Sequence, residues 1–263
     1  MADRTSLALN TAVNRFDRIQ ILAVILALGL TAFLAIQPSQ NWLLLLVSGL
    51  AALGTDAIVR THPRAHFQRL DDTAIFLFVP VLFTLGLGIF VQDVAYGHWT
   101  IAIGLLSAIP YWAILRAEYE SIDRSSPNFQ STRLVLNVAT YVTAFLFFAA
   151  IYNFGLNPVT ASFAAGVVSV LLAVDILREE GLDTARTMIY ASAVGVILAE
   201  SAWTTHFLPL EGRAAAVFLL LSFYLMTGLM HNYLGHRLNL KTAAEFTAVA
   251  LAGAGIIALS HLS

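Results

Sequence analysis

Long apolar runs follow one another along almost the whole chain, and short polar stretches separate them. A helix needs roughly 17–25 mostly apolar residues to cross the hydrocarbon core of a bilayer. Nine runs have this length: 19–36, 42–59, 74–91, 99–115, 134–153, 159–177, 188–207, 214–233 and 246–262. They lack the alternation of polar and apolar residues that marks the strands of a membrane barrel. The pattern predicts an all-α, polytopic integral membrane helix bundle with about nine transmembrane helices.

The composition excludes a soluble protein. Of the 263 residues, 59% are hydrophobic and only 11% are charged, and the mean hydropathy is +0.78. A soluble domain carries about 25% charged residues, because water must wet its surface. A disordered chain and a nucleic-acid-binding protein are excluded on the same ground. The absence of cysteine from the sequence also excludes disulfides and thiolate metal sites.

The basic residues predict the orientation. If the N-terminus lies in the cytoplasm and nine spans alternate, all but one of the 14 lysine and arginine residues fall in cytoplasmic stretches. Arg213 is the exception. Short cytoplasmic loops of membrane proteins carry such an excess of positive charge. We therefore predict an N-in, C-out multi-pass protein of a bacterial-type inner (plasma) membrane.

Two regions are expected along the chain. Residues 1–18 form a cytoplasmic N-terminal segment with apolar residues at helical spacing. This segment is suited either to lie on the inner leaflet as an amphipathic helix or to extend the first span. Residues 19–263 form a single transmembrane helical domain. Within it, Pro80 and Pro110 predict kinks in the third and fourth spans.

Two acidic residues stand about one turn from the predicted cytoplasmic ends of their spans. Asp56 precedes Arg60 by four positions, and Asp175 precedes Arg178 by three. Side chains at these spacings are neighbours on a helix surface. The spacing predicts two ion pairs at the inner interface.

Glu200 is the candidate for an intramembrane polar site. It lies well inside the seventh predicted span, where a charged group costs about 2.5–3.5 kcal/mol on insertion scales. Ser222 and Tyr224 of the eighth span are expected at a similar depth and are potential hydrogen-bond donors. The site is then either a proton-coupling or ligand-binding carboxylate, or a structural hydrogen bond between two helices.

Four histidines are metal-ligand candidates on the predicted cytoplasmic side: His62, His66, His231 and His236. Imidazole is a good ligand for zinc and iron. Their spacing resembles the histidine boxes of membrane-bound fatty-acid desaturases and hydroxylases. Those sites use more histidines and include adjacent pairs, whereas this chain has seven histidines in all and no adjacent pair. We predict no metal, cofactor or catalytic residue here, and leave pigment or metal binding open.

Small residues recur at helix-packing spacing in two spans. Ser162 and Gly166 stand four positions apart. In the last span, Ala248, Ala252 and Gly255 are separated by four and three positions. Such spacing lets helix backbones approach closely in lipid. The close approach is either within this chain or at an interface with another subunit, and the last span is the candidate for contact with a partner.

The expected partners are the lipid bilayer and other membrane subunits, and no nucleic acid. Three classes of function remain. The preferred one is a non-enzymatic integral membrane subunit or scaffold of a larger membrane assembly, whose cytoplasmic loops form the polar interaction face. The alternative is a small-solute or proton-coupled transporter that uses Glu200. A weaker alternative is a membrane enzyme that acts on lipid with a histidine metal site on the cytoplasmic face. Short loops and few intramembrane charges favour the first class.

Overall fold

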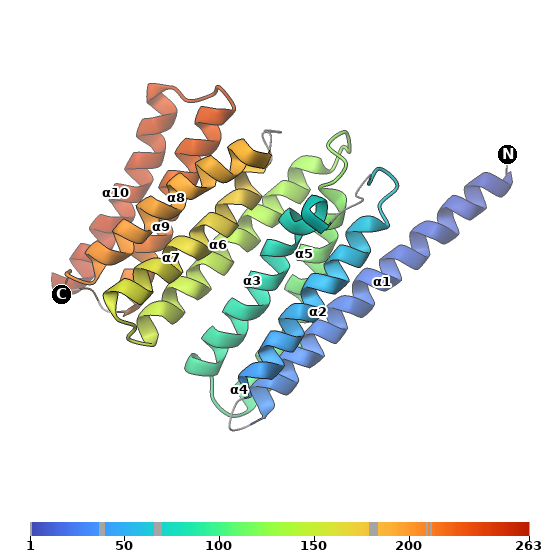
Figure 1. Ribbon diagram of the computed structural model, residues 1–263, viewed down its shortest axis with the longest axis horizontal. Coiled ribbons are helices and arrows are strands. Elements are labelled where there is room, and N and C mark those ends of the chain that lie inside the picture. Colours follow the sequence, from blue (N-terminus) through green and yellow to red (C-terminus); the bar gives the residue numbers. More distant parts are fainter. Residues whose placement is uncertain are drawn as a thin grey trace. The chain divides into compact units, whose positions relative to one another are not determined.

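The computed structural model describes residues 2–36, 40–65, 70–178, 184–208, 210 and 212–262, and in this part of the chain it contains helices and no strand. The helices are α1 (Ala2–Ala35), α2 (Asn41–Arg60), α3 (Leu70–Val94), α4 (His98–Leu106), α5 (Ala108–Glu120), α6 (Phe129–Asn153), α7 (Pro158–Leu177), α8 (Thr184–Thr205), α9 (Gly212–Leu234) and α10 (Leu240–Leu262) (Figure 1). The predicted all-α architecture is confirmed.

Seven helical segments of the described part are long and apolar enough to cross a membrane. They are Arg18–Ala35, Asn41–Arg60, Asp72–Val94, His98–Glu120, Phe129–Asn153, Pro158–Leu177 and Gly212–Leu234. Each coincides with a predicted span. The remaining two predicted spans correspond to α8 and α10, which have 22 and 23 residues. The chain is thus a multi-pass helical membrane protein, while nine crossings and the N-in, C-out orientation stay predictions.

The fourth span is broken into α4 and α5 at Ser107. Pro110 explains the place of the break, because proline has no N–H to donate to the carbonyl four residues earlier. That carbonyl belongs to Leu106, the last residue of α4. The Ser107 hydroxyl donates to the carbonyl of Gly104 at 2.5 Å and closes the end of α4. Pro80 lies inside α3, where the Thr84 hydroxyl donates to its carbonyl at 2.8 Å.

The chain divides into two compact units, residues 1–139 and 140–263. In the first unit, α1 packs against α2, α4 and α5, and α2 packs against α3. Buried residues of α1 include a series at alternating steps of four and three, Ile19, Ala23, Leu26, Leu30 and Phe33, and Ala27 and Leu34 beside it are buried too. This is the spacing of a helix-packing seam. The opposite side is exposed yet also apolar: Ile21, Val24, Ile25 and Leu28. A helix that is apolar all round suits a lipid environment.

In the second unit, α7 packs against α8 and α9, and α9 packs against α8 and α10. Ala161, Ala165 and Leu172 of α7 are completely buried, as are Val194 and Leu198 of α8. The Asn157 side chain accepts a hydrogen bond from the backbone N–H of Thr160 and caps the start of α7. The core of this unit therefore lies along the α7–α8 pair.

Candidate functional site

A closed polar cluster joins α2 to α3. Arg60 Nε donates to Asp56 Oδ2 at 2.8 Å, which confirms the predicted ion pair. The hydroxyl of Thr73, a buried residue of α3, donates to the other carboxylate oxygen of Asp56. Arg60 Nη2 in turn donates to Thr73 Oγ1 at 3.4 Å. Each of the three side chains thus contacts the other two.

A second cluster of the same kind joins α5 to α6. Arg116 Nε donates to Glu120 Oε1 at 2.8 Å, and Thr132 Oγ1 of α6 donates to Glu120 Oε2 at 3.1 Å. The guanidinium carbon of Arg116 also lies 5.3 Å from the ring centroid of Trp112, a distance typical of a cation–π contact.

The third cluster is the most buried and joins α6 to α7. Arg178 Nη2 lies 2.7 Å from Asp175 Oδ1, so the second predicted ion pair is also confirmed. Thr140 Oγ1 donates to Asp175 Oδ2 at 3.1 Å. The Asp175 side chain has no exposed surface. A buried carboxylate needs a nearby opposite charge and hydrogen-bond donors, and here the Arg178 guanidinium supplies the charge and the Thr140 hydroxyl one donor.

A fourth ion pair joins two loops. Arg64 Nη1 donates to Asp123 Oδ1 and to the hydroxyl of Ser125. The pKa of Asp123 lies below its ordinary value of 3.8, chiefly because the Ser125 hydroxyl donates to it. The partial desolvation of the carboxyl acts in the opposite direction, while the Ser125 backbone N–H and the charges of Arg64 and His62 lower the pKa further.

The three clusters between helices share one arrangement, which was not predicted from the sequence. In each, an acid pairs with an arginine one helical turn away, and the hydroxyl of a threonine on a neighbouring helix donates to the acid. The threonines stand 17, 12 and 35 positions away from their acids in the chain. Spacing within one helix identifies the ion pairs but carries no signal for these cross-helix partners. The arrangement ties helices together and leaves the carboxylates engaged.

Two further ionisable residues are buried at the α5–α6 connection. Glu118 and Arg133 are 0% and 3% exposed, although the apolar runs placed them in a cytoplasmic stretch. They are buried because α5 continues to Glu120 and α6 begins at Phe129, beyond the ends of the apolar runs. Hydropathy marks the part of a helix that suits lipid and not where the helix ends.

Glu200 has its side chain exposed on α8. Its backbone carbonyl accepts a hydrogen bond from Thr204 Oγ1 at 2.9 Å, and no hydrogen bond to its carboxylate occurs among the residues whose side chains the structure describes. The Ser222 hydroxyl donates to the carbonyl of Phe218 at 3.0 Å. The Tyr224 ring packs 5.2 Å from that of Phe246. Neither expected donor therefore hydrogen-bonds the Glu200 carboxylate.

The small residues of the two spans lie in different environments. Ser162 is buried, and the backbone of Gly166 touches that of Gly195 on α8. By contrast, Ala248, Ala252 and Gly255 of α10 are exposed. The first set lies where α7 meets α8, and the second faces outward.

The histidines of the described part take up separate roles. His62 Nδ1 accepts a hydrogen bond from the backbone N–H of Arg64 at 3.2 Å, and its ring packs edge-on against Tyr119 with centroids 4.7 Å apart. His231 lies in the last turn of α9, and His236 follows that helix with a left-handed φ of 54°. His66 lies outside the described residues. Among the residues that the structure describes, no three potential ligands gather into a metal site.

The fold and these clusters define a multi-pass membrane protein whose helices are tied together by ionic and hydroxyl contacts. The chain belongs to the family described as "Protein of unknown function (DUF5656)", whose model matches residues 18–260. Neither a curated protein nor a solved structure matches the chain.

Proposed function

We propose that this chain is a non-enzymatic subunit or scaffold of a larger assembly in a bacterial-type inner membrane. The outer face of α8 around Glu200 would contact a second membrane protein, and the predicted cytoplasmic loops would form the polar interaction face. The main observation that supports this proposal is that the Glu200 side chain is exposed on α8, a helix that packs against the candidate span α7.

The depth of Glu200 follows from the contact between α7 and α8. Gly166 lies near the middle of α7, a candidate span, and its backbone meets Gly195 near the middle of α8. Glu200 follows Gly195 by five positions, which is about 7.5 Å along a helix axis. Half of the hydrocarbon core measures about 15 Å. The carboxylate is therefore expected at hydrocarbon depth.

A carboxylate that faces hydrocarbon needs a partner. The cost of an unmatched charge is about 2.5–3.5 kcal/mol on insertion scales, and ionisable groups in membranes normally pair or face protein. The neighbours of Glu200 on the same side of α8 include the large exposed side chains Val196, at 58%, and Trp203, at 44%, and the exposed Thr204, whose hydroxyl donates to the backbone carbonyl of Glu200. A donor on the helix of a partner subunit would satisfy the carboxylate while covering these side chains.

A transporter that couples through Glu200 requires this carboxylate to line a cavity. A pocket of about 210 Å³ lies between α9 and α10 in the second unit, and Glu200 is not among its lining residues.

The predicted cytoplasmic loops support the subunit proposal. There Arg64 and Asp123 hold two connections together at the surface and offer a shaped polar face.

The test is copurification of the affinity-tagged chain from its native membranes in a mild detergent. A stoichiometric membrane partner is expected with the wild type and should be lost with Glu200→Leu, which removes both charge and hydrogen bonding. The matched control is Glu245→Leu, because Glu245 is also exposed but lies near the start of α10. A partner that stays bound to the Glu200→Leu variant, or the absence of any partner from the wild type, would contradict the proposal.

A further inference from the structure

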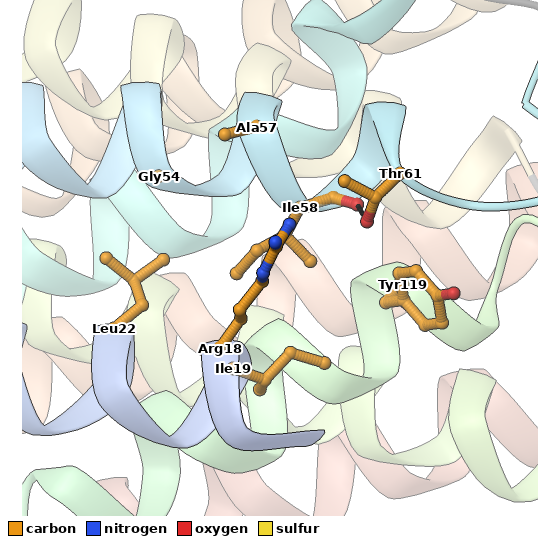
Figure 2. Close-up of a pocket in the computed structure, with 8 residues that line it drawn as sticks. All are labelled: Arg18, Ile19, Leu22, Gly54, Ala57, Ile58, Thr61 and Tyr119. Carbon is orange, nitrogen blue, oxygen red and sulfur yellow. Dashed lines mark hydrogen bonds between the residues drawn. The ribbon is translucent and has the colours of Figure 1, made fainter. Parts of the chain in front are cut away.

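A small pocket opens within the first unit between α1, α2 and α5 (Figure 2). Its volume is about 180 Å³, and its walls are mainly apolar, with Ile19 and Leu22 on α1 and Ala57 and Ile58 on α2. Its shape arises where α1 meets α2. A Cβ on Gly54 would lie 2.5 Å from Leu22 Cδ2, so only glycine lets Leu22 lie this close to the α2 backbone.

The polar groups of the pocket lie at the ends of three candidate spans. Arg18 directly precedes the first predicted span, which begins at residue 19, Thr61 directly follows the second, and Tyr119 is next to the last residue of the span that comprises α4 and α5. Because these residues line one pocket, they share one end of the unit. The pocket therefore lies where headgroups meet acyl chains, with its apolar wall on the hydrocarbon side.

Arg18 differs from three other arginines of this unit. Arg60, Arg64 and Arg116 each hold a carboxylate of this unit. Arg18 forms no ion pair with any residue whose side chain the structure describes. Figure 2 shows its side chain extending from α1 toward α2, beside the pocket.

The other polar groups that line the pocket limit the chemical class of ligand that it can bind. The Thr61 hydroxyl donates to the Ile58 carbonyl at 2.6 Å, so its hydrogen is already used and Arg18 is the cationic anchor. The residues that line the pocket include no carboxylate that would receive the ammonium group of a zwitterionic lipid. A guanidinium is well suited to hold a phosphate through charge-assisted hydrogen bonds.

From this juxtaposition we propose that the pocket binds an anionic phospholipid of the surrounding leaflet. The Arg18 guanidinium would hold the phosphodiester, and the proximal part of an acyl chain would lie against Leu22 and Ala57. Basic pockets between transmembrane helices bind anionic headgroups by this chemistry. A free phosphate would leave the apolar wall unused, so the lipid is the occupant that matches both halves of the pocket.

The experiment is native mass spectrometry of the full chain in detergent, titrated with phosphatidylglycerol or with phosphatidylcholine of identical acyl chains. One bound phosphatidylglycerol is expected to be retained preferentially. Arg18→Gln should weaken this retention about tenfold, which corresponds to the loss of one charge-assisted anchor. Arg237→Gln is the matched control, because Arg237 is an exposed arginine that is also predicted to face the cytoplasm. This control should bind as the wild type does.

A second variant tests the apolar half while keeping the charge. Ala57→Phe places a large ring in the pocket and should weaken phosphatidylglycerol retention by a similar factor. Circular dichroism and gel filtration establish that both variants are folded. Inorganic phosphate at millimolar concentration should not displace the lipid. Equal retention by Arg18→Gln and wild type, equal retention of the two lipids, or displacement by inorganic phosphate alone would each overturn the proposal.

Discussion

Gly166 of α7 and Gly195 of α8 lie backbone to backbone. A Cβ on Gly166 would lie 3.1 Å from the carbonyl oxygen of Gly195, and a Cβ on Gly195 would lie 2.8 Å from the carbonyl oxygen of Gly166. Neither oxygen belongs to a side chain that can rotate away. The distance between the two helices therefore leaves no room for a Cβ at Gly195 and little at Gly166, and small residues at such crossings drive helix association in lipid.

Gly195→Ala is expected to destabilise the protein by about 1–3 kcal/mol, because the added methyl group must push α7 and α8 apart. The measurement is thermal unfolding in detergent. Gly49→Ala is the control, because a Cβ at Gly49 meets nothing within 4 Å. This control should leave the melting temperature unchanged or raise it, since alanine favours a helix more than glycine does. Equal melting temperatures for Gly195→Ala and wild type would show that α7 and α8 are not so close.

Thr73→Val should lower the free energy of unfolding by about 1 kcal/mol. Valine has nearly the shape of threonine, but it removes the hydroxyl that lies between Asp56 and Arg60 and joins α2 to α3. Urea or heat unfolding of the purified protein measures the change. Thr247→Val, at an exposed position of α10, is the matched substitution and is expected to have no such effect. If both variants lose the same stability, the hydroxyl of Thr73 is not the cause.

Asp175→Asn is expected to cost about 3–5 kcal/mol, because it leaves the positive charge of Arg178, whose side chain is only 11% exposed, without its carboxylate. The double variant Asp175→Leu with Arg178→Met removes both charges and should be considerably more stable than the single variant. The comparison is made from unfolding midpoints under identical detergent conditions. A double variant as unstable as the single one contradicts the charge-pair explanation.

The contact between the loops of Arg64 and Asp123 should weaken in acid. Because the pKa of Asp123 is lowered in the folded protein, its contribution to stability is present above the ordinary value of 3.8 and is lost as the pH falls through the lower folded value. Hydrogen exchange in residues 121–126 should therefore differ between wild type and Asp123→Asn at pH 6. The difference should shrink as the pH falls well below 3.8. Comparing the two proteins at each pH cancels the intrinsic change of exchange rate, and a difference that does not change with pH would contradict the prediction.

The parts of this structure that sequence patterns predicted are those that depend on neighbours in one helix. Apolar run length located the helices, Pro110 lies just beyond the break in the fourth span, and helical spacing identified the pairs Asp56–Arg60 and Asp175–Arg178. Such features follow from the period of the helix and from the lack of an N–H in proline.

The cross-helix features required coordinates. Thr73 and Thr140 reach their carboxylates from other helices, and no periodicity links positions 17 or 35 residues apart. The sequence pattern also did not predict whether Glu200 lies on the packed or the exposed side of α8. Both sides carry apolar residues, with Val194 and Leu198 buried and Val196 exposed. Where both sides suit lipid, hydropathy does not distinguish them.

The unbroken course of α1 has a mechanical consequence. This helix has 34 residues and is about 51 Å long, whereas the apolar run that predicts its membrane-crossing part begins at residue 19. Roughly 25 Å of regular backbone therefore precede this predicted crossing part. A helix acts as a stiff spacer, so whatever binds near its tip would be held at a set height above the bilayer and would turn together with the crossing segment.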